Sequence, residues 1–280
     1  MGDVVMGDVL SAVALRKSFD KVAAVNGIDV TLRAGERVGL LGPNGAGKTT
    51  SLLMMLGAIL PDSGTITIAG HSLPRHRSKA MANVGFVAGY LPLPDRLKVR
   101  EALGVFAGWY GLRKTKQIVA TALDKFEIGH LGGQLCSSLS SGQRTLVGIV
   151  KATLHDPALL VLDEPTASLD PDVALRVRSG LLQHCRRTGA AMLITSHDMR
   201  EVTMLATRVI FLAHGTVVAN DTPENIAASF GHDDLEGVFL NLAERHRTGR
   251  HGAGQHGTEQ HGTEQHAAGQ HGVGPSETVA

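Results

Sequence analysis

The sequence predicts an α/β protein built on a mostly parallel sheet, and three observations support that expectation. An apolar run at residues 37–41, a glycine-rich turn and a helical stretch follow one another without interruption. A second apolar run at 158–162 ends in two carboxylates, and continuous apolar runs are typical of strands buried on both faces of a parallel sheet. Between these runs, from about residue 90, the apolar spacing changes to that of helices.

The predicted elements follow in chain order. Strand-like and turn-like stretches alternate over residues 11–87. Within them we expect a helix over 50–60 that ends at Pro61, a turn at 61–64 and a strand at 65–68. Two helical faces are then expected in the middle segment, one with Ala102, Phe106 and Trp109, the other with Val119, Ala122, Leu123 and Phe126. Strands and helices of the core resume over about 156–222.

The glycine-rich turn matches the phosphate-binding loop pattern G-x-x-x-x-G-K-[ST] at every fixed position. Its glycines let consecutive backbone N–H groups face a phosphate, at the N-terminus of the following helix. Lys48 can reach the β- and γ-phosphates of a nucleotide, and Thr49 can place its hydroxyl on Mg²⁺. The predicted nucleotide contacts are the whole loop and the residue after it: Gly42, Pro43, Asn44, Gly45, Ala46, Gly47, Lys48, Thr49 and Thr50.

The two carboxylates after the second apolar run are Asp163 and Glu164. Ligands of parallel sheets bind beyond the carboxyl ends of the strands, which is where this pair is expected. Asp163 is therefore predicted to hold Mg²⁺, and Glu164 to polarise the water that attacks the γ-phosphate. Without the phosphate-binding loop, the same pair could be read as a solvated strand-end turn.

Further motifs indicate a family. Residues 139–143 read Leu-Ser-Ser-Gly-Gln and resemble the LSGGQ signature of ATP-binding-cassette (ABC) proteins, with Ser141 where the commonest form has glycine. Residues 168–170 resemble the D-loop of that family, and Thr195-Ser-His-Asp198 resembles its switch-histidine segment. The resemblance covers roughly residues 10–245, and it is strongest for ATP-binding subunits of ABC transporters of the ABC-2-type exporter group.

The resemblance implies an ABC-type core with an antiparallel β subdomain and an inserted helical subdomain at about 90–155. The ABC ATPase domain would span 11–245, after a lead-in over 1–10 and before a tail over 246–280. It also implies ATP and Mg²⁺ as cofactors, a transmembrane permease subunit as partner, and a second ATPase subunit, in a homodimer or heterodimer, facing this one head to tail.

The resemblance also assigns individual residues. Glu164 would act as the catalytic base, and His197 would hold the attacking water against the γ-phosphate. Phe19 would stack on adenine, and Asp170 would link the two nucleotide sites of the dimer. The γ-phosphate would be bound from across the dimer interface by the signature residues Ser140, Ser141, Gly142 and Gln143. The family's usual glutamine after the strand near residue 87 is replaced by Gly89, which leaves that contact without a side chain.

Composition limits the alternatives. A formal net charge of +1 over 280 residues gives no basic footprint for nucleic acid, so no nucleic acid partner is expected. Two cysteines favour a reducing compartment, and no apolar run approaches the roughly 18 residues that span a bilayer. The acidic first ten residues do not read as a secretory signal. These points fit a cytoplasmic protein, peripheral on the cytoplasmic face of the membrane.

Two other functions remain open from the residues alone. A soluble ABC ATPase acting on nucleic acid or ribosomes would share the same motifs. Such proteins usually add a second cassette or a long coiled-coil insertion, and this chain has neither. A P-loop kinase would share the phosphate-binding loop, but it would need neither the signature segment nor the switch histidine.

The C-terminal region divides into two parts. Residues 234–242 resemble the closing segment of exporter ATP-binding subunits, although a generic amphipathic helix would look the same, and the resemblance favours export. From 248 onward, histidine recurs every fifth residue among Gly, Gln, Thr and Glu. So few apolar residues predict a disordered tail, whose imidazoles are either incidental or bind a transition metal.

Overall fold

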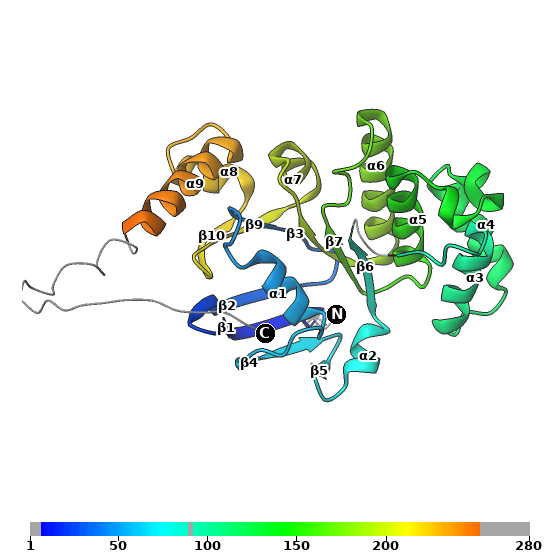
Figure 1. Ribbon diagram of the computed structural model, residues 1–280, viewed down its shortest axis with the longest axis horizontal. Coiled ribbons are helices and arrows are strands. Elements are labelled where there is room, and N and C mark those ends of the chain that lie inside the picture. Colours follow the sequence, from blue (N-terminus) through cyan, green and yellow to red (C-terminus); the bar gives the residue numbers. More distant parts are fainter. Residues whose placement is uncertain (1–6, 89–91, 253–280) are drawn as a thin grey trace, which may run out of the picture.

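The chain forms two β-sheets and a lobe of helices in the computed structural model, which describes residues 7–88 and 92–252 (Figure 1). The predictions for Gly89 and for the histidine-rich tail from 253 onward lie outside the described residues. Within the described parts, no helix is both long and apolar enough to cross a membrane.

The central sheet has six strands and is mostly parallel, as the sequence predicts. All neighbouring pairs are parallel except β10 and β9, which are antiparallel. In spatial order the strands are β10 (Thr216–Asp221), β9 (Arg208–Ala213), β3 (Arg37–Leu41), β8 (Ala191–Thr195), β7 (Leu159–Asp163) and β6 (Val84–Ala88). The two predicted apolar runs are thus β3 and β7, and the carboxyl ends of β3, β7 and β8 meet at one edge of the sheet.

A second sheet of four antiparallel strands forms the β subdomain that the family resemblance implies. Its order is β2 (Val22–Leu32), β1 (Leu10–Phe19), β4 (Ser63–Ile68) and β5 (His71–Leu73). Its apolar side chains share one core with α1 (Lys48–Met55) and with one face of the central sheet. The short helix α2 (Arg77–Met81) connects this sheet to β6.

Helix α1 is shorter than the sequence predicts. We expected a helix over 50–60 that stops at Pro61, but α1 ends at Met55. Gly57 follows with a φ of 63°, and the N–H of Ala58 donates to the carbonyl of Leu53. A glycine in this left-handed conformation closes a helix, so Gly57 rather than the proline terminates α1.

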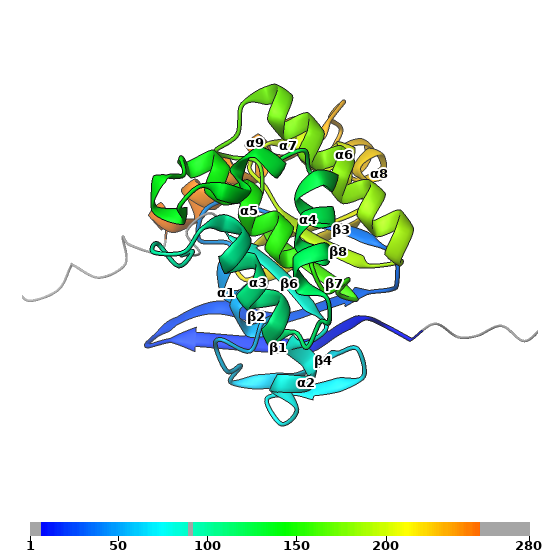
Figure 2. The ribbon, with the colours of Figure 1, turned by 90° about the vertical axis from the view of Figure 1, so that its right-hand side faces the viewer.

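The opposite face of the central sheet packs on a helical lobe, which faces the viewer in Figure 2. The lobe contains α3 (Val99–Trp109), α4 (Thr115–Lys125), two short 3-10 helices (Gly129–Gly133 and Cys136–Ser138) and α5 (Ser141–Thr153). Helix α6 (Pro171–Thr188) lies beside α5 and shares its core.

The prediction for α3 was only partly right. Ala102 is buried as expected, but Trp109 is 76% exposed and contacts Phe106 edge to face. Trp109 is the last residue of α3, so its side chain lies at the end of the predicted apolar face and stays exposed.

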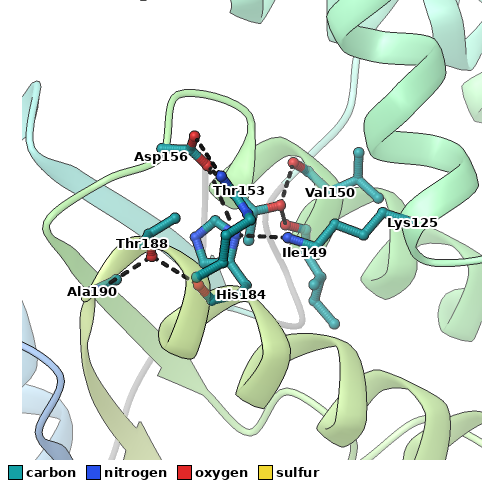
Figure 3. Close-up of polar contacts among 9 residues, drawn as sticks. Lys125, Ile149, Val150, Thr153, Asp156, His184, Thr188 and Ala190 are labelled. Carbon is teal, nitrogen blue, oxygen red and sulfur yellow. Dashed lines mark hydrogen bonds and ion pairs between the residues drawn. The ribbon is translucent and has the colours of Figure 1, made fainter.

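Polar side chains join the lobe to α6 (Figure 3). Nζ of Lys125, at the end of α4, lies 3.1 Å from Nδ1 of His184, which is fully buried in α6. Beside them, the guanidinium of Arg187 pairs with the carboxylate of Asp156 at 2.5 Å. Burial is the main reason that the pKa of His184 falls to about 4, so this imidazole is neutral at neutral pH and accepts a hydrogen bond from Lys125.

The end of the described chain packs on the same face of the central sheet as the helical lobe, but over β3 and β9 (Figure 1). There α7 (Met199–Leu205), α8 (Pro223–Ser229) and α9 (Leu235–Gly252) share a core with β3 and β9. Leu235, Val238 and Leu242 are the buried face of α9, which gives the expected amphipathic pattern at 234–242. Helix α9 runs on past residue 245, where we expected the domain to end.

Candidate functional site

The phosphate-binding loop connects β3 to the N-terminus of α1, and close packing explains its glycines. Gly42, Gly45 and Gly47 have φ angles of 145°, 80° and 99°, which other residues rarely adopt. A Cβ on Gly42 would lie 2.2 Å from the carbonyl oxygen of Leu212, and one on Gly47 would lie 2.4 Å from that of Ala24. The loop is therefore clamped between β9 and β2, and only glycine fits at those two positions.

Lys48 is held inside this loop. Its Nζ donates to the carbonyl oxygens of Gly42 and Pro43 at 2.5 and 3.0 Å. Burial lowers the pKa of the ammonium group, and the carboxylates of Glu164 and Asp163 act in the opposite direction. Both acceptors of this ammonium group are neutral carbonyls, and an ionised phosphate oxygen attracts a cation more strongly than a neutral carbonyl does.

The two predicted carboxylates lie where β7 ends, facing the loop across one cavity. Oδ1 of Asp163 accepts a hydrogen bond from the hydroxyl of Thr195 at 2.6 Å, which orients the carboxylate. Glu164 has a φ of 53°, and its N–H donates to the carbonyl of Thr195 at 3.1 Å. The left-handed backbone costs a non-glycine residue on the order of 1 kcal/mol, and it turns Glu164 away from the line of the strand.

His197 lines the same cavity and lies beside Glu164. Its Nδ1 lies 2.5 Å from Oε2 of Glu164, and its side chain is 71% exposed. The two residues come from neighbouring strands, β7 and β8, whose parallel pairing brings their ends together. A carboxylate and an imidazole this close can share the proton that a water molecule loses when it attacks a phosphate.

These side chains surround a cavity of about 650 Å³, a size typical of small-molecule sites. The predicted residues that line it are Gly42, Asn44, Gly45, Gly47, Lys48, Thr49, Thr50, Asp163, Glu164 and His197. Pro43 and Ala46 belong to the loop but do not line the cavity. Residues that the sequence did not single out for the cavity are Val22, Ala23, Ala24, Thr195, Ser196, His214 and Phe239.

Phe19 does not line this cavity. It ends β1 at the turn into β2, is 47% exposed, and lies 5.7 Å from Nζ of Lys17 by its ring centroid. The cavity wall nearest to it is formed by residues 22–24 of β2 instead. Stacking of Phe19 on adenine stays a prediction.

The signature segment lies at the N-terminus of α5, in a separate cavity of about 330 Å³. Ser140 caps this helix: its hydroxyl accepts from the N–H of Gln143 at 3.3 Å, and the Gln143 side chain accepts from the N–H of Ser140. A Cβ on Gly142 would lie 3.0 Å from the carbonyl oxygen of Ser168, so the signature segment packs closely on the D-loop. Ser141 and Asp170 also line this second cavity.

The two cavities share no lining residue, although each contains part of the predicted site. The phosphate-binding loop and the catalytic side chains surround one, while the signature segment and Asp170 surround the other. A helix N-terminus such as that of α5 attracts anions through its free N–H groups and dipole. Within one chain, this donor group and the phosphate-binding loop do not face the same space.

The loop cavity also suits Mg²⁺. Thr49 and Asp163 both line it and offer a hydroxyl and a carboxylate oxygen, the ligand types that Mg²⁺ prefers. Mg²⁺ usually takes only one or two protein ligands beside phosphate oxygens and water.

Comparison with known proteins identifies the family. Residues 25–167 match the family described as ABC transporter. Nod factor export ATP-binding protein I of Rhizobium sp. (strain N33) is 35% identical over 75% of this chain and 69% of its own length. Linearmycin resistance ATP-binding protein LnrL of Bacillus subtilis (strain 168) is 32% identical over 81% of this chain and 73% of its own length. The chain belongs to the ABC transporter family.

Solved structures of ABC ATPase domains have the same fold. An ATP-binding subunit of an ABC transporter superposes with a TM-score of 0.78 at 24% identity, covering 84% of this chain and 99% of that one. The protein cbiO1 of Clostridium perfringens, part of the transporter complex cbiONQ, gives a TM-score of 0.72 at 25% identity, covering 87% and 99%. This ABC ATPase therefore has the mixed sheet, β subdomain and helical lobe expected from its sequence.

Proposed function

We propose that this chain is the ATP-hydrolysing subunit of an ABC exporter that drives a separate transmembrane permease from the cytoplasmic face of the membrane. Relatives named for Nod factor export and for linearmycin resistance support export as the direction of transport. One observation carries the proposal: the predicted catalytic side chains and the signature segment line two separate cavities of one chain, an arrangement that suits two half-sites for ATP.

We further propose that the second ATPase subunit is another copy of this chain. This chain carries both the catalytic motifs and the signature segment, so two copies arranged head to tail would complete each other. The N-terminus of α5, capped by Ser140, would meet the γ-phosphate held by the phosphate-binding loop of the facing copy. Ser141, Gly142 and Gln143 would line the same contact, and Asp170 would lie between the two sites.

In this proposal, Thr49 and Asp163 would hold Mg²⁺, which would supply positive charge against the phosphates. The hydroxyl of Thr195 already fixes one oxygen of Asp163, so the other remains for the metal. Lys48 exchanges its bonds to the carbonyls of Gly42 and Pro43 for phosphate oxygens. The loop N–H groups and Lys48 then orient the γ-phosphate for in-line attack.

Hydrolysis needs one proton transfer. Glu164 takes a proton from the attacking water, whose oxygen forms the new bond to the γ-phosphorus as the bond to the β-phosphate oxygen breaks. His197, 2.5 Å from Glu164, holds the water and the γ-phosphate in line. The products are ADP and inorganic phosphate, and loss of the γ-phosphate releases the contact to the facing copy. Cycles of closure and release would drive the permease.

A pull-down tests this function. The Glu164→Gln chain, which is expected to keep ATP bound, is captured from detergent-solubilised membranes with Mg-ATP, and bound proteins are identified by mass spectrometry. Recovery of a polytopic membrane protein, lost in a matched Lys48→Ala capture, supports the exporter proposal. Recovery of only soluble factors or ribosomes, with the chain absent from the membrane fraction, contradicts it and favours a soluble ABC ATPase.

A further inference from the structure

Glu201, in the first turn of α7, is almost fully buried, and charged side chains are rare at buried positions. It is only 1% exposed and lies beneath the carboxyl edge of the central sheet, next to the segment that carries His197. Burying a carboxylate without partners costs several kcal/mol, so such groups are retained where they are paired or hydrogen-bonded. The partners of Glu201 therefore indicate what it does.

Both carboxylate oxygens of Glu201 accept short hydrogen bonds from hydroxyl groups. Oε1 accepts from Thr166 at 2.5 Å, and Oε2 accepts from Ser196 at 2.6 Å. Both donors are themselves buried. Bonds from a hydroxyl to a carboxylate at 2.5–2.7 Å are the charge-assisted type, which is stronger than a bond between neutral groups.

The two donors belong to the segments that carry the catalytic pair. Thr166 follows Glu164 by two residues, and Ser196 immediately precedes His197. The carboxylate of Glu201 thus bridges the turn after β7 and the turn after β8. The side chains of Glu164 and His197 meet on the other side of the same bridge, 2.5 Å apart.

Glu201 is itself fixed from two directions. Asp198 caps α7, since its Oδ1 accepts from the N–H groups of Arg200 and Glu201. The N–H of Asp198 donates back to the hydroxyl of Ser196 at 3.1 Å. The helix start, Ser196 and Glu201 form a closed set of hydrogen bonds, so the carboxylate cannot shift without disturbing the backbone beside His197.

The same bridge extends toward the signature helix. The N–H of Leu169 donates to the carbonyl of Thr166 at 3.0 Å, which orders the D-loop. The hydroxyl of Ser168 in that loop lies 3.0 Å from the hydroxyl of Thr145 in α5. Thr166 is therefore bonded both to Glu201 and to the segment that leads into the second cavity.

We propose that Glu201 is a positioning residue for ATP hydrolysis: through Thr166 and Ser196 it sets the separation of Glu164 and His197 without touching the nucleotide. The inference rests on the proposed roles of Glu164 and His197. Misplacing a catalytic group by about 1 Å can cost roughly 100-fold in rate. Loss of the bridge should therefore lower kcat, while the phosphate-binding loop, which is not a hydrogen-bond partner of the Glu201 carboxylate, keeps its affinity for ATP.

The first test is Glu201→Gln, which preserves shape but replaces one acceptor oxygen with an N–H donor. We expect kcat to fall about 10- to 100-fold, with KM for ATP and equilibrium binding of ATP within about twofold of wild type. Glu224→Gln is the matched control, because Glu224 lies in the first turn of α8 but is exposed. Wild-type kcat for Glu201→Gln with a lowered melting temperature would show a merely structural role and overturn the inference.

Single-hydroxyl variants keep the test valid if Glu201→Gln folds poorly. Thr166→Val has the shape of threonine without its donor and should lower kcat, whereas Thr166→Ser keeps the donor and should restore kcat to near the wild-type value. Combining Thr166→Val with Glu201→Gln should cost little more than Glu201→Gln alone, because both break the same bond. Equal kcat for the valine and serine variants would contradict the proposal.

The outcome separates this inference from the proposed function. If Glu164→Gln hydrolyses ATP normally, the assignment of the catalytic pair fails, and the inference about Glu201 fails with it. If Glu164→Gln is inactive while Glu201→Gln and Thr166→Val turn over at the wild-type rate, only the role of Glu201 is wrong.

Discussion

The loop cavity and the signature cavity of this ABC ATPase differ in what they can do to a phosphate. The loop cavity combines Lys48, Asp163, Glu164 and His197, so it can bind, neutralise and hydrolyse. The signature cavity offers the capped N-terminus of α5 beside Asp170, and the glutamate that lines it, Glu127, pairs with Arg176 at 3.4 Å instead of with a histidine. Under the proposed function, this difference is a division of labour: the loop cavity carries the chemistry, and the signature cavity supplies donors that act when a second subunit brings them to the γ-phosphate.

The largest effect should come from removing the base in the loop cavity. Glu164→Gln keeps the size of the side chain but cannot accept the proton of water, so the hydrolysis rate should fall by about 10²- to 10⁴-fold. ATP binding should remain, because Lys48 and the loop are unchanged. Phosphate release and nucleotide affinity are the two measurements. Near-normal release would remove Glu164 as the base.

The next effect should appear in binding. Lys48→Ala removes the cation that the loop holds ready, and losing a charge-assisted contact of about 1.5–3 kcal/mol should weaken ATP binding roughly 10- to 100-fold. Titration with a fluorescent ATP analogue measures the change, and Lys116→Ala, an exposed lysine on α4, is the control. Unchanged affinity would contradict the assignment of the phosphate-binding loop.

Variants of the signature cavity sharpen the comparison. Ser140→Ala should lower ATP hydrolysis about tenfold, an effect of roughly 1.4 kcal/mol, while ATP binding to the monomer stays unchanged. Ser140→Gly also removes the hydroxyl, but glycine serves as an N-cap with a loss of only a few tenths of a kcal/mol. Both variants should therefore be impaired. If glycine restores hydrolysis, Ser140 acts only as a helix cap and not as a donor to ATP.

The last prediction concerns folding stability and not ATP, at the junction between the helical lobe and α6. The pKa of His184 is about 4 in the folded protein, below the ordinary 6.5. The unfolded chain therefore takes up a proton first as pH falls below 6.5, and this group's contribution to stability is lost between pH 6.5 and 4. The free energy of unfolding should fall by up to about 1.4 kcal/mol per pH unit from this group.

Urea denaturation at pH 7.5 and pH 5 checks the role of His184. His184→Gln should lose less stability between the two conditions than wild type, whereas His130→Gln, an exposed histidine on the lobe, should behave like wild type. An equal loss in His184→Gln and wild type would show that the buried imidazole does not cause the acid sensitivity.

Local spacing made part of the loop cavity predictable. The loop glycines, Lys48 and Thr49 are adjacent in sequence, and the carboxylates directly follow an apolar strand. Parallel sheet geometry then brings Asp163 and His197 to the same edge. The predicted end of α1 was wrong because Gly57, rather than Pro61, closes the helix.

Other contributors to the site depend on contacts between distant segments. Phe239 reaches the loop cavity from α9, which only the packing of α9 on β9 makes possible. Glu201 lies four residues after His197, a helical spacing that could have suggested a link, but its bond to Thr166 spans 35 positions. A carboxylate in an otherwise apolar helix face was the available signal.

Sedimentation of the purified Glu164→Gln chain tests most directly whether the two cavities meet around ATP. With Mg-ATP its mass should double, and without nucleotide, or with the added Lys48→Ala change, it should remain a monomer. A monomer at saturating Mg-ATP would contradict the account that two copies of this chain complete each other's ATP site.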